Sequence, residues 1–365
     1  MKIGFITSSL SSEDGWGRYS KSLVESVAQH AEVAVITHNN AKNETSLSNV
    51  YPVLPRCSFH PKVQWKTYKS CMKYFQGCEI IHSLVEPFAP GSAFAAKQLG
   101  VYFIMTLHGT YAIPPKKWYS VRRHFLRYAL KSAHMSTTGS LYTEQKAREQ
   151  AVFGECRFIP NGVDSTLFRR LKDIQPKDFL LTTGAVKSRK GQDVVVEALA
   201  LLQDEFPNVR YKIVGDTSNF EFVQKIMKRS EVLGINDKVE FLGCVSDKKI
   251  VELYNQCRIF ILAARDIEGQ FEGFPMVFYE ANACGAPVVT TRGFGSEYAI
   301  KDGKNGFLVK SESPEDLANV LKNILSDETL RENMSTFGLR EAANHTWDKI
   351  AQNYLMKMYR DILKS

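Results

Sequence analysis

The chain has 365 residues, of which 44% are hydrophobic and 24% are charged, and its formal net charge is +8. This length predicts two domains, because a single hydrophobic core stops growing beyond about 250–300 residues. No apolar run approaches the roughly 20 residues that span a bilayer, which argues against a transmembrane helix. The opening MKIGFITSS predicts a buried strand rather than a signal peptide, so we expect a cytoplasmic protein.

Short apolar runs alternate with helical patterns along nearly the whole chain. The runs predict strands at Ile3–Ile6, Val33–Ile36, Ile80–His82, Phe103–Leu107, Leu180–Thr183, Tyr211–Val214, Val239–Leu242, Ile259–Leu262 and Pro287–Thr290. Helical spacing predicts helices at 17–30, 192–206, 220–233 and 248–256. The runs are continuous, which is typical of parallel strands covered on both faces. This order predicts an α/β fold with doubly wound sheets.

The strand–helix pattern restarts near residue 178, after IPNGVDSTLF at 159–168. The Pro-Asn-Gly turn and the polar residues after it suit a linker between domains. We therefore expect a Rossmann-like N-terminal domain at 1–165 and a second Rossmann-like domain at 166–345. Apolar residues at helical spacing predict a last helix at 346–365, which crosses back to pack on the first domain.

The positive charge is confined to the first half of the chain. Residues 1–165 contain 19 Lys and Arg against 11 Asp and Glu, whereas the remaining residues contain 28 of each. Between Thr45 and Thr143 the only acidic residues are Glu79 and Glu86. This asymmetry predicts an anionic partner for the first half, such as a nucleic acid, a membrane surface or a phosphorylated acceptor.

The segment EGFPMVFYEANACGAPVV at 272–289 carries two carboxylates around the start of a predicted helix. Glu272 precedes the helix, and Glu280 is expected about a turn and a half inside it. The free N–H groups of residues 273–277 would favour an anion such as a diphosphate. Carboxylates accept hydrogen bonds from vicinal hydroxyls, so Glu272 suits a hexose and Glu280 a ribose. Spacing alone is equally compatible with an amphipathic helix carrying two solvated glutamates.

Seven segments follow one another in an order and spacing that chance rarely produces. They are DGWGRYSKSL at 14–23, TLHGT at 106–110, IPNGVDSTLF at 159–168, GAVKSRKG at 184–191, FLGCVSDKKIVELYNQCRIFI at 241–261, EGFPMVFYE at 272–280 and GKNGFLV at 303–309. Over nearly the whole chain this set resembles glycosyltransferase family 4. The resemblance implies a GT-B fold, in which two Rossmann-like domains face each other, and transfer of a sugar from a nucleoside-diphosphate donor.

The resemblance also implies roles for individual residues. Arg189 and Lys190 would neutralise the donor diphosphate, and His108 would lie beside the transferred sugar. Glu272 completes the expected catalytic set. Donor-binding roles are implied for Gly15, Gly17, Cys244, Val245, Gly273, Phe274, Pro275, Met276, Val277 and Glu280. Cys244 and Val245 would meet the base through backbone atoms, so the base and the hexose stay unassigned.

No cofactor or metal ion is expected. The resemblance implies a retaining reaction in which the departing phosphate takes the acceptor's proton. The sequence shows no paired aspartates at a strand end and no histidine cluster. Its seven cysteines are scattered without metal-ligand spacing, which argues against a zinc site or a disulfide framework.

Two residues depart from the family pattern. Ala185 follows Gly184 where Gly-Arg is usual, and Pro275 replaces the second glycine of Glu-Gly-Phe-Gly. These departures leave open the alternative that the protein is a catalytically silent sugar-nucleotide binder, which acts as a partner subunit. A nucleotide-sugar epimerase or a phosphorylase of the same fold is a further alternative. A dinucleotide-dependent oxidoreductase is disfavoured, because the first strand is not followed by G-x-G-x-x-G.

The basic excess is concentrated in two aromatic-rich stretches, at 60–75 and 116–131. A basic amphipathic helix with Trp and Phe is typical of a membrane interface, although a core-facing stripe with cationic flanks fits equally well for either stretch alone. The residues assigned to the membrane or acceptor are Lys116, Lys117, Trp118, Arg122, Arg123 and Arg127. We expect no nucleic acid partner. The expected acceptor is a glycan or lipid-linked molecule of cell-surface polysaccharide or glycolipid synthesis, met on the cytoplasmic face of the membrane.

Overall fold

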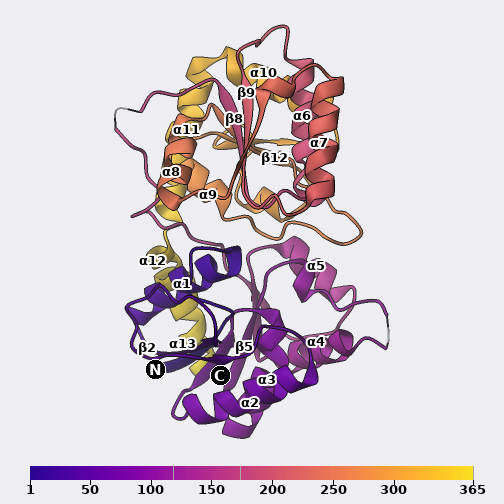
Figure 1. Ribbon diagram of the computed structural model, residues 1–365. Coiled ribbons are helices and arrows are strands. Elements are labelled where there is room, and N and C mark those ends of the chain that lie inside the picture. The colour runs from indigo at the N-terminus through magenta and orange to yellow at the C-terminus, as the bar shows by residue number, and fades with distance from the viewer. Residues whose placement is uncertain (118, 173, 365) are drawn as a thin grey trace. The chain divides into compact units, whose positions relative to one another are not determined.

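The computed structural model describes residues 1–117, 119–172 and 174–364. The chain forms two compact units (Figure 1). The first unit contains Met1–Gly162 together with the C-terminal segment from Trp347 onward, and the second contains Val163–Thr346. Each unit has its own parallel sheet and its own hydrophobic core. The predicted α/β class with two Rossmann-like sheets is confirmed.

The sheet of the first unit has the order β3-β2-β1-β4-β5-β6-β7 in the described residues, and all neighbouring strands are parallel. The strands are β1 Lys2–Ile6, β2 Glu32–His38, β3 Val50–Leu54, β4 Ile80–Ser83, β5 Tyr102–Leu107, β6 Met135–Thr138 and β7 Cys156–Phe158. The sequence analysis missed β3, β6 and β7. Pro52 argues against a strand at β3, because proline has no N–H for the sheet. Strand β6 is mostly hydroxyl residues, and β7 has only three residues.

The helices of the first unit form two groups. They are α1 Gly15–Ala28, α2 Pro61–Tyr74, α3 Ala89–Leu99, α4 Val121–Ser132 and α5 Leu141–Arg148, followed at the C-terminus by α12 Trp347–Ile350 and α13 Met356–Lys364. One group consists of α2, α3 and α4, in which α3 contacts both of its neighbours (Figure 1). In the other group α1 packs against α12 and the π-helical turn Ala351–Leu355 that follows it.

The sheet of the second unit has the parallel order β10-β9-β8-β11-β12-β13 in the described residues. Its strands are β8 Phe179–Thr183, β9 Arg210–Val214, β10 Val239–Gly243, β11 Ile259–Leu262, β12 Val288–Thr291 and β13 Gly306–Val309. Its helices are α6 Gln192–Leu201, α7 Phe220–Val232, α8 Asp247–Gln256, α9 Val277–Ala283, α10 Pro314–Ser326 and α11 Glu328–Asn344. The sequence analysis predicted these strands except β13.

The strand order of each sheet indicates where a ligand would bind. The chain order reverses between β1 and β4 in the first sheet and between β8 and β11 in the second. In open parallel sheets, ligands bind outside the carboxyl ends of the strands at such a reversal. The loops after these four strands are therefore where functional side chains are expected.

No helix among residues 1–117, 119–172 and 174–364 combines the length and the apolar character that a membrane span needs.

The C-terminal segment is anchored in the first unit by a buried hydrogen-bond chain. The Tyr359 hydroxyl lies 2.7 Å from Nδ1 of His82, and Nε2 of His82 lies 2.9 Å from the Thr106 hydroxyl. Burial lowers the pKa of His82 to about 3, so the ring stays neutral and can link the two hydroxyls. Trp347 packs against Gly162, where a side chain would collide with the indole ring.

Replacement of Tyr359 should therefore destabilise the first unit. We expect Tyr359→Phe to lower the free energy of unfolding by about 1 kcal/mol, the usual value of one hydrogen bond. Tyr359→Ala should lower it by about 3–5 kcal/mol, because it also leaves a cavity. Urea unfolding followed by circular dichroism measures both. Tyr354→Ala, at a position 40% exposed, is the control and should change stability little. Equal effects at 354 and 359 would contradict this anchoring.

Candidate functional site

The basic loop that follows β8 is shaped by two glycines. Gly184 has a φ of 114° and Gly191 a φ of 68°, both in the region that favours glycine. A side chain at Gly191 would also collide with the carbonyl group of Ala263, which follows β11. Arg189 and Lys190 lie in the short 3₁₀ turn between these glycines. The loop is therefore packed directly against the chain that leaves the neighbouring strand.

Arg265 fastens this loop from the β11 side. Its main-chain N–H donates to the carbonyl of Arg189 at 2.9 Å, and its Nε donates to the carbonyl of Ser188 at 2.8 Å. Its Nη2 pairs with Asp193 at 2.8 Å, in the first turn of α6. The guanidinium is buried, so the pair is shielded from water. The sequence left open whether Arg265 belongs to a specificity loop or to a merely solvated one, because nothing in its spacing indicates these partners.

The structure brings Arg189, Lys190 and Glu272 into one ionic cluster. Oε1 of Glu272 pairs with Arg189 and lies 3.2 Å from Nζ of Lys190. The side chains of Lys190 and Glu272 are each 11% exposed. Burial and the positive charges of Arg189 and Lys187 lower the pKa of Lys190 to about 7. Two cations thus share a single carboxylate oxygen.

Glu280 occupies a different place in its helix than expected. The helix α9 begins at Val277, so Glu280 lies in its first turn and not a turn and a half inside it. The residue before a proline avoids the helical region, which keeps Phe274 out of the helix. Glu280 is buried, and its Oε2 accepts a hydrogen bond from Tyr254 at 3.2 Å. The Tyr254 hydroxyl also lies 2.7 Å from that of Thr183, at the end of β8.

The other expected donor-binding residues of the second unit flank the same edge of the sheet. Cys244 is exposed and Val245 half-buried, directly after β10. The remaining residues, Gly273, Phe274, Pro275, Met276 and Val277, connect Glu272 to α9. Their proposed contacts with a nucleotide stay a prediction.

In the first unit, His108 follows β5 and is held on two sides. Its Nε2 donates to the carbonyl of Leu84 at 2.7 Å, and its main-chain N–H donates to Oε1 of Glu86 at 2.7 Å. Burial lowers the pKa of His108 to about 4, so the ring is neutral at pH 7. Because Nε2 carries the proton, Nδ1 is left as a hydrogen-bond acceptor.

Glu86 is a buried carboxyl group for which no role was predicted from the sequence. Burial raises its pKa to about 7, and its Oε2 has no hydrogen-bond partner among the described residues. The feature of the sequence that could have indicated Glu86 is its rarity, since it is one of only two acidic residues between Thr45 and Thr143. Its contact with the His108 main chain makes it a positioning group for that loop.

The two glycines of the first loop differ in their surroundings. A side chain at Gly17 would come within 2.5 Å of the Ser9 hydroxyl, whereas one at Gly15 would meet nothing within 4 Å. The internal packing of the loop therefore explains why residue 17 is a glycine. Gly15 leaves the backbone accessible, as an approach to phosphate would require. Asp14 caps the helix by accepting a hydrogen bond from the N–H of Gly17 at 2.9 Å.

The basic residues expected at a membrane divide into two kinds. Nη2 of Arg122 donates to the carbonyls of Thr110, Tyr111 and Ile113, and the other two arginines also donate to carbonyls, Arg123 to Pro115 and Arg127 to Gln150. These arginines brace neighbouring loops. Lys116 and Lys117 are exposed, and Trp118 lies outside the described residues.

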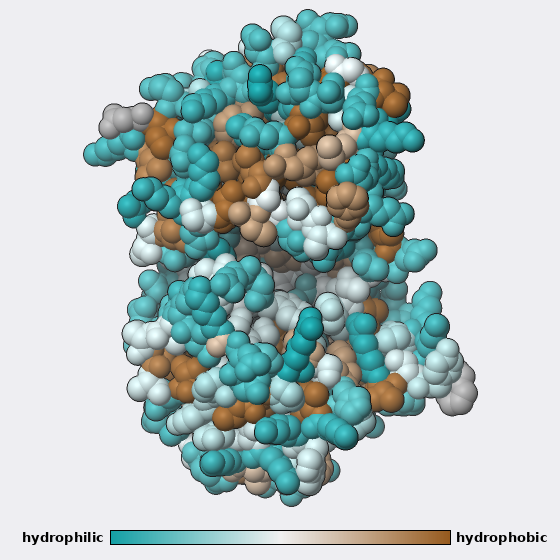
Figure 2. Space-filling model, viewed as in Figure 1, coloured by the Kyte–Doolittle hydropathy of each residue, from teal (hydrophilic) through white to brown (hydrophobic). Residues whose placement is uncertain are grey.

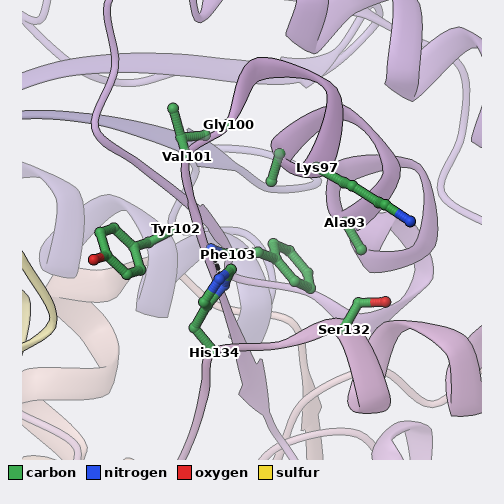
Figure 3. A pocket seen from close by; sticks show the side chains of 9 residues that line it. Ala93, Lys97, Gly100, Val101, Tyr102, Phe103, Ser132 and His134 are labelled. Atoms are coloured by element: carbon green, nitrogen blue, oxygen red, sulfur yellow. Dashed lines mark hydrogen bonds between the residues drawn. The ribbon is translucent and has the colours of Figure 1, made fainter. Parts of the chain in front are cut away.

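The first unit also has a shallow pocket at the opposite edge of its sheet (Figure 3). Val101, Tyr102 and Phe103 line it at the start of β5, and Nδ1 of His134 accepts a hydrogen bond from the Phe103 N–H at 3.0 Å. His108 follows the other end of this strand. The pocket is therefore separate from the candidate site.

No group of three or more His, Cys, Asp or Glu within the described part of the chain could hold a metal ion.

Two family models match consecutive parts of the chain. The model for Glycosyltransferase Family 4 matches residues 14–167, and that for Glycosyl transferases group 1 matches residues 164–340. The chain belongs to glycosyltransferase family 4. It is thus an enzyme of the class that transfers sugars from nucleotide-sugar donors.

Individual relatives are distant. An uncharacterized glycosyltransferase of Methanocaldococcus jannaschii, MJ1178, is 26% identical over 79% of this chain and 76% of its own length. A D-inositol 3-phosphate glycosyltransferase of Thermobifida fusca is 30% identical over 55% of this chain and 49% of its own. The chain thus spans about half the length of that relative. Anabaena HepE, solved with UDP and glucose, superposes with a TM-score of 0.80 over 99% of this chain and all of HepE at 19% identity, which shows the shared GT-B fold.

The pKa of Lys190 predicts a pH dependence for nucleotide binding by this family 4 enzyme. A protonated Lys190 attracts a diphosphate, and that attraction is lost as the pH rises through about 7. We expect the affinity for UDP to fall between pH 7 and pH 9. In Lys190→Arg the charge is permanent, so the fall should be absent. Isothermal titration calorimetry at constant ionic strength measures both profiles, and parallel profiles would contradict the prediction.

Proposed function

We propose that the enzyme transfers a hexose from a nucleoside-diphosphate sugar to a glycan or lipid-linked acceptor and retains the anomeric configuration. The observation that carries this proposal is the cluster of Arg189, Lys190 and Glu272 at the carboxyl edge of the second sheet. Two cations suit a diphosphate, and a carboxylate suits sugar hydroxyls. HepE was solved with UDP and glucose, which supports a donor of this class.

In this proposal the donor exchanges the partners of the ionic cluster. The diphosphate takes Arg189 and Lys190 as counter-charges, and Glu272 turns to the hydroxyl groups of the hexose. Glu280, held by Tyr254, accepts the ribose hydroxyls. The exchange is favourable because a diphosphate compensates two buried cations better than one carboxylate oxygen does.

The proposed reaction needs neither a metal ion nor an organic cofactor. The bond from the anomeric carbon to the diphosphate oxygen breaks, and the acceptor oxygen bonds to the same face of that carbon. The acceptor's proton passes to the departing phosphate oxygen. Arg189 and Lys190 stabilise the negative charge that grows on the diphosphate, which is electrostatic transition-state stabilisation.

We assign the donor to the second unit and the acceptor to the first. The basic excess of the first unit supports an acceptor at an anionic membrane surface, on the cytoplasmic side. The surface that fits best lies on α2 and α3, where hydrophobic and hydrophilic side chains lie side by side (Figure 2). Trp65 is 55% exposed and Phe94 40% exposed, and both rings pack on Tyr68.

Helix α2 also carries four exposed lysines. They are Lys62, Lys66, Lys69 and Lys73, and Lys69 lies 5.1 Å from the Trp65 ring centre. The arginines of α4 donate to backbone carbonyls, so α2 offers the more available charge for lipid headgroups. The membrane contact is thus proposed for α2 and α3, with Lys116 and Lys117 as further cations.

Substitutions in the ionic cluster should separate its two roles. Lys190→Ala should weaken UDP binding about 10–100-fold, the value of a charge-assisted hydrogen bond. Glu272→Gln should not weaken UDP binding, because it removes the carboxylate that competes with the diphosphate for Arg189 and Lys190. It should remove most of the extra affinity for the nucleotide sugar, because the carboxylate no longer accepts the sugar hydroxyls. Calorimetry without metal, with UDP, GDP and ADP and their glucose conjugates, measures both and identifies the base.

The matched controls lie on the surface of the same unit. Lys228→Ala removes an exposed lysine of α7, and Glu268→Gln removes an exposed carboxylate of the loop before Glu272. Both should bind like the wild type. If Lys190→Ala and Glu272→Gln also bind and turn over like the wild type, the donor site is wrongly assigned.

The membrane surface is tested by sedimentation with vesicles. We expect binding to vesicles with 30% phosphatidylglycerol and weak binding to pure phosphatidylcholine. Reversing Lys66, Lys69 and Lys73 to Glu should reduce binding more than tenfold, because each cation near an anionic surface contributes about 1 kcal/mol. Trp65→Ala with Phe94→Ala should also reduce it. Lys228→Glu is the control, and equal loss in the control would contradict this surface.

A further inference from the structure

An aromatic cluster lies at the carboxyl edge of the first sheet, next to His108. The rings of Trp16 and Tyr111 meet edge to face with centres 4.9 Å apart, and the Trp16 ring centre is 6.3 Å from that of His108. Trp16 lies in the first turn of α1, after β1, and Tyr111 lies in the 3₁₀ turn after β5. This is the edge where the strand order reverses, between β1 and β4.

Tyr111 is 50% exposed, yet its position is firmly held. Arg122 donates from Nη2 to the carbonyls of Thr110, Tyr111 and Ile113 at 2.9, 3.3 and 3.3 Å. The guanidinium carbon also lies 5.4 Å from the Tyr111 ring centre, a cation–π distance. The ring is thus both exposed and braced, which lowers the entropy that a ligand must remove on binding.

Trp16 is held from the other side of the cluster. Gly17 packs against Ser9 and Ser11 so closely that no side chain fits, and Asp14 caps the helix at the N–H of Gly17. The half-buried indole therefore sits on a fixed first turn of α1. Two aromatic rings from different loops, each locked by its own contacts, form a preorganised surface.

We propose that Trp16 and Tyr111 bind the acceptor through an uncharged pyranose ring that packs on their aromatic faces. This inference rests on the proposed function and names the chemical class of its acceptor. The apolar C–H face of a pyranose suits an aromatic surface, and its hydroxyls need a few polar groups beside it. Nδ1 of neutral His108 is such an acceptor.

The charges around the cluster favour a neutral sugar over a phosphate group. Arg122 lies beside Tyr111, and its Nη2 is already shared by three carbonyl groups. Its Nε is buried and has no partner among the described residues, so this atom is not open to a ligand on the surface. Glu86, which contacts the His108 main chain, adds no positive charge in either protonation state. A phosphate on this surface would have to compete with the three carbonyl groups for Arg122.

Ligand-observed NMR tests the proposal with defined probes. The probes are methyl α-D-glucopyranoside, methyl α-D-mannopyranoside, methyl β-D-galactopyranoside and methyl N-acetyl-β-D-glucosaminide, and glycerol 3-phosphate represents a charged acceptor. We expect at least one pyranoside to bind the wild type with saturation transfer to its ring protons. Tyr111→Ala and Trp16→Leu should each weaken this binding at least tenfold. Tyr111→Phe keeps the ring and should stay within about threefold, the effect of at most one hydrogen bond.

Two controls keep the outcomes distinct. Tyr128→Ala removes an exposed tyrosine of α4 outside the cluster and should bind pyranosides like the wild type. Binding of the nucleoside diphosphate that the wild type prefers among UDP, GDP and ADP reports the donor site and should be unchanged in all four variants. If the wild type binds none of these three nucleotides, the proposed function is contradicted. The acceptor proposal is overturned if no pyranoside binds, if the Ala and Leu variants bind normally, or if glycerol 3-phosphate alone binds.

Discussion

All neighbouring strands in both described sheets run parallel, and this constraint determines where chemistry can gather in the enzyme. Loops that leave parallel strands at their carboxyl ends emerge at the same edge of the sheet, however far apart they are in the sequence. In the second unit this brings Arg189 and Lys190, after β8, against Glu272, after β11. In the first unit it brings Trp16, after β1, together with His108 and Tyr111, after β5.

The cations at the edge of the second sheet are used in two different ways. Arg265 is buried, and its donors are shared among the Ser188 carbonyl, Asp193 and Glu312, so it acts as a fixed support. Lys190 has one carboxylate oxygen as its counter-charge and shares it with Arg189. Exchanging that single partner for a ligand costs little, whereas breaking the Arg265 pair would leave a buried charge unpaired. The loop can thus stay rigid while its two functional cations change partners.

Much of this fold could be predicted from the sequence, because most strands are continuous apolar runs. Strand β6, one of the strands not predicted, shows the limit. Residues Ser136, Thr137 and Thr138 are fully buried although they carry hydroxyl groups, and the hydroxyls of Thr137 and Thr138 bond to Thr106 and to the Leu107 carbonyl. Such burial depends on partners from other strands, which local composition does not show. The roles of Arg265 and Glu86 could not be predicted for the same reason, since only the tertiary fold supplies Asp193 and the His108 main chain.

The first unit shows why a count of charges does not locate a binding surface. Its basic excess suggested an anionic partner, but the arginines of α4 are engaged with backbone carbonyls. At the edge beside them, burial keeps His108 neutral, and it raises the pKa of Glu86 to about 7. Arg122 is the cation beside the aromatic cluster, and its Nη2 is engaged with three backbone carbonyl groups. Lysines without such bracing lie on the outer face of α2. One unit can thus combine a cationic exterior, suited to an anionic surface, with an aromatic edge suited to a sugar.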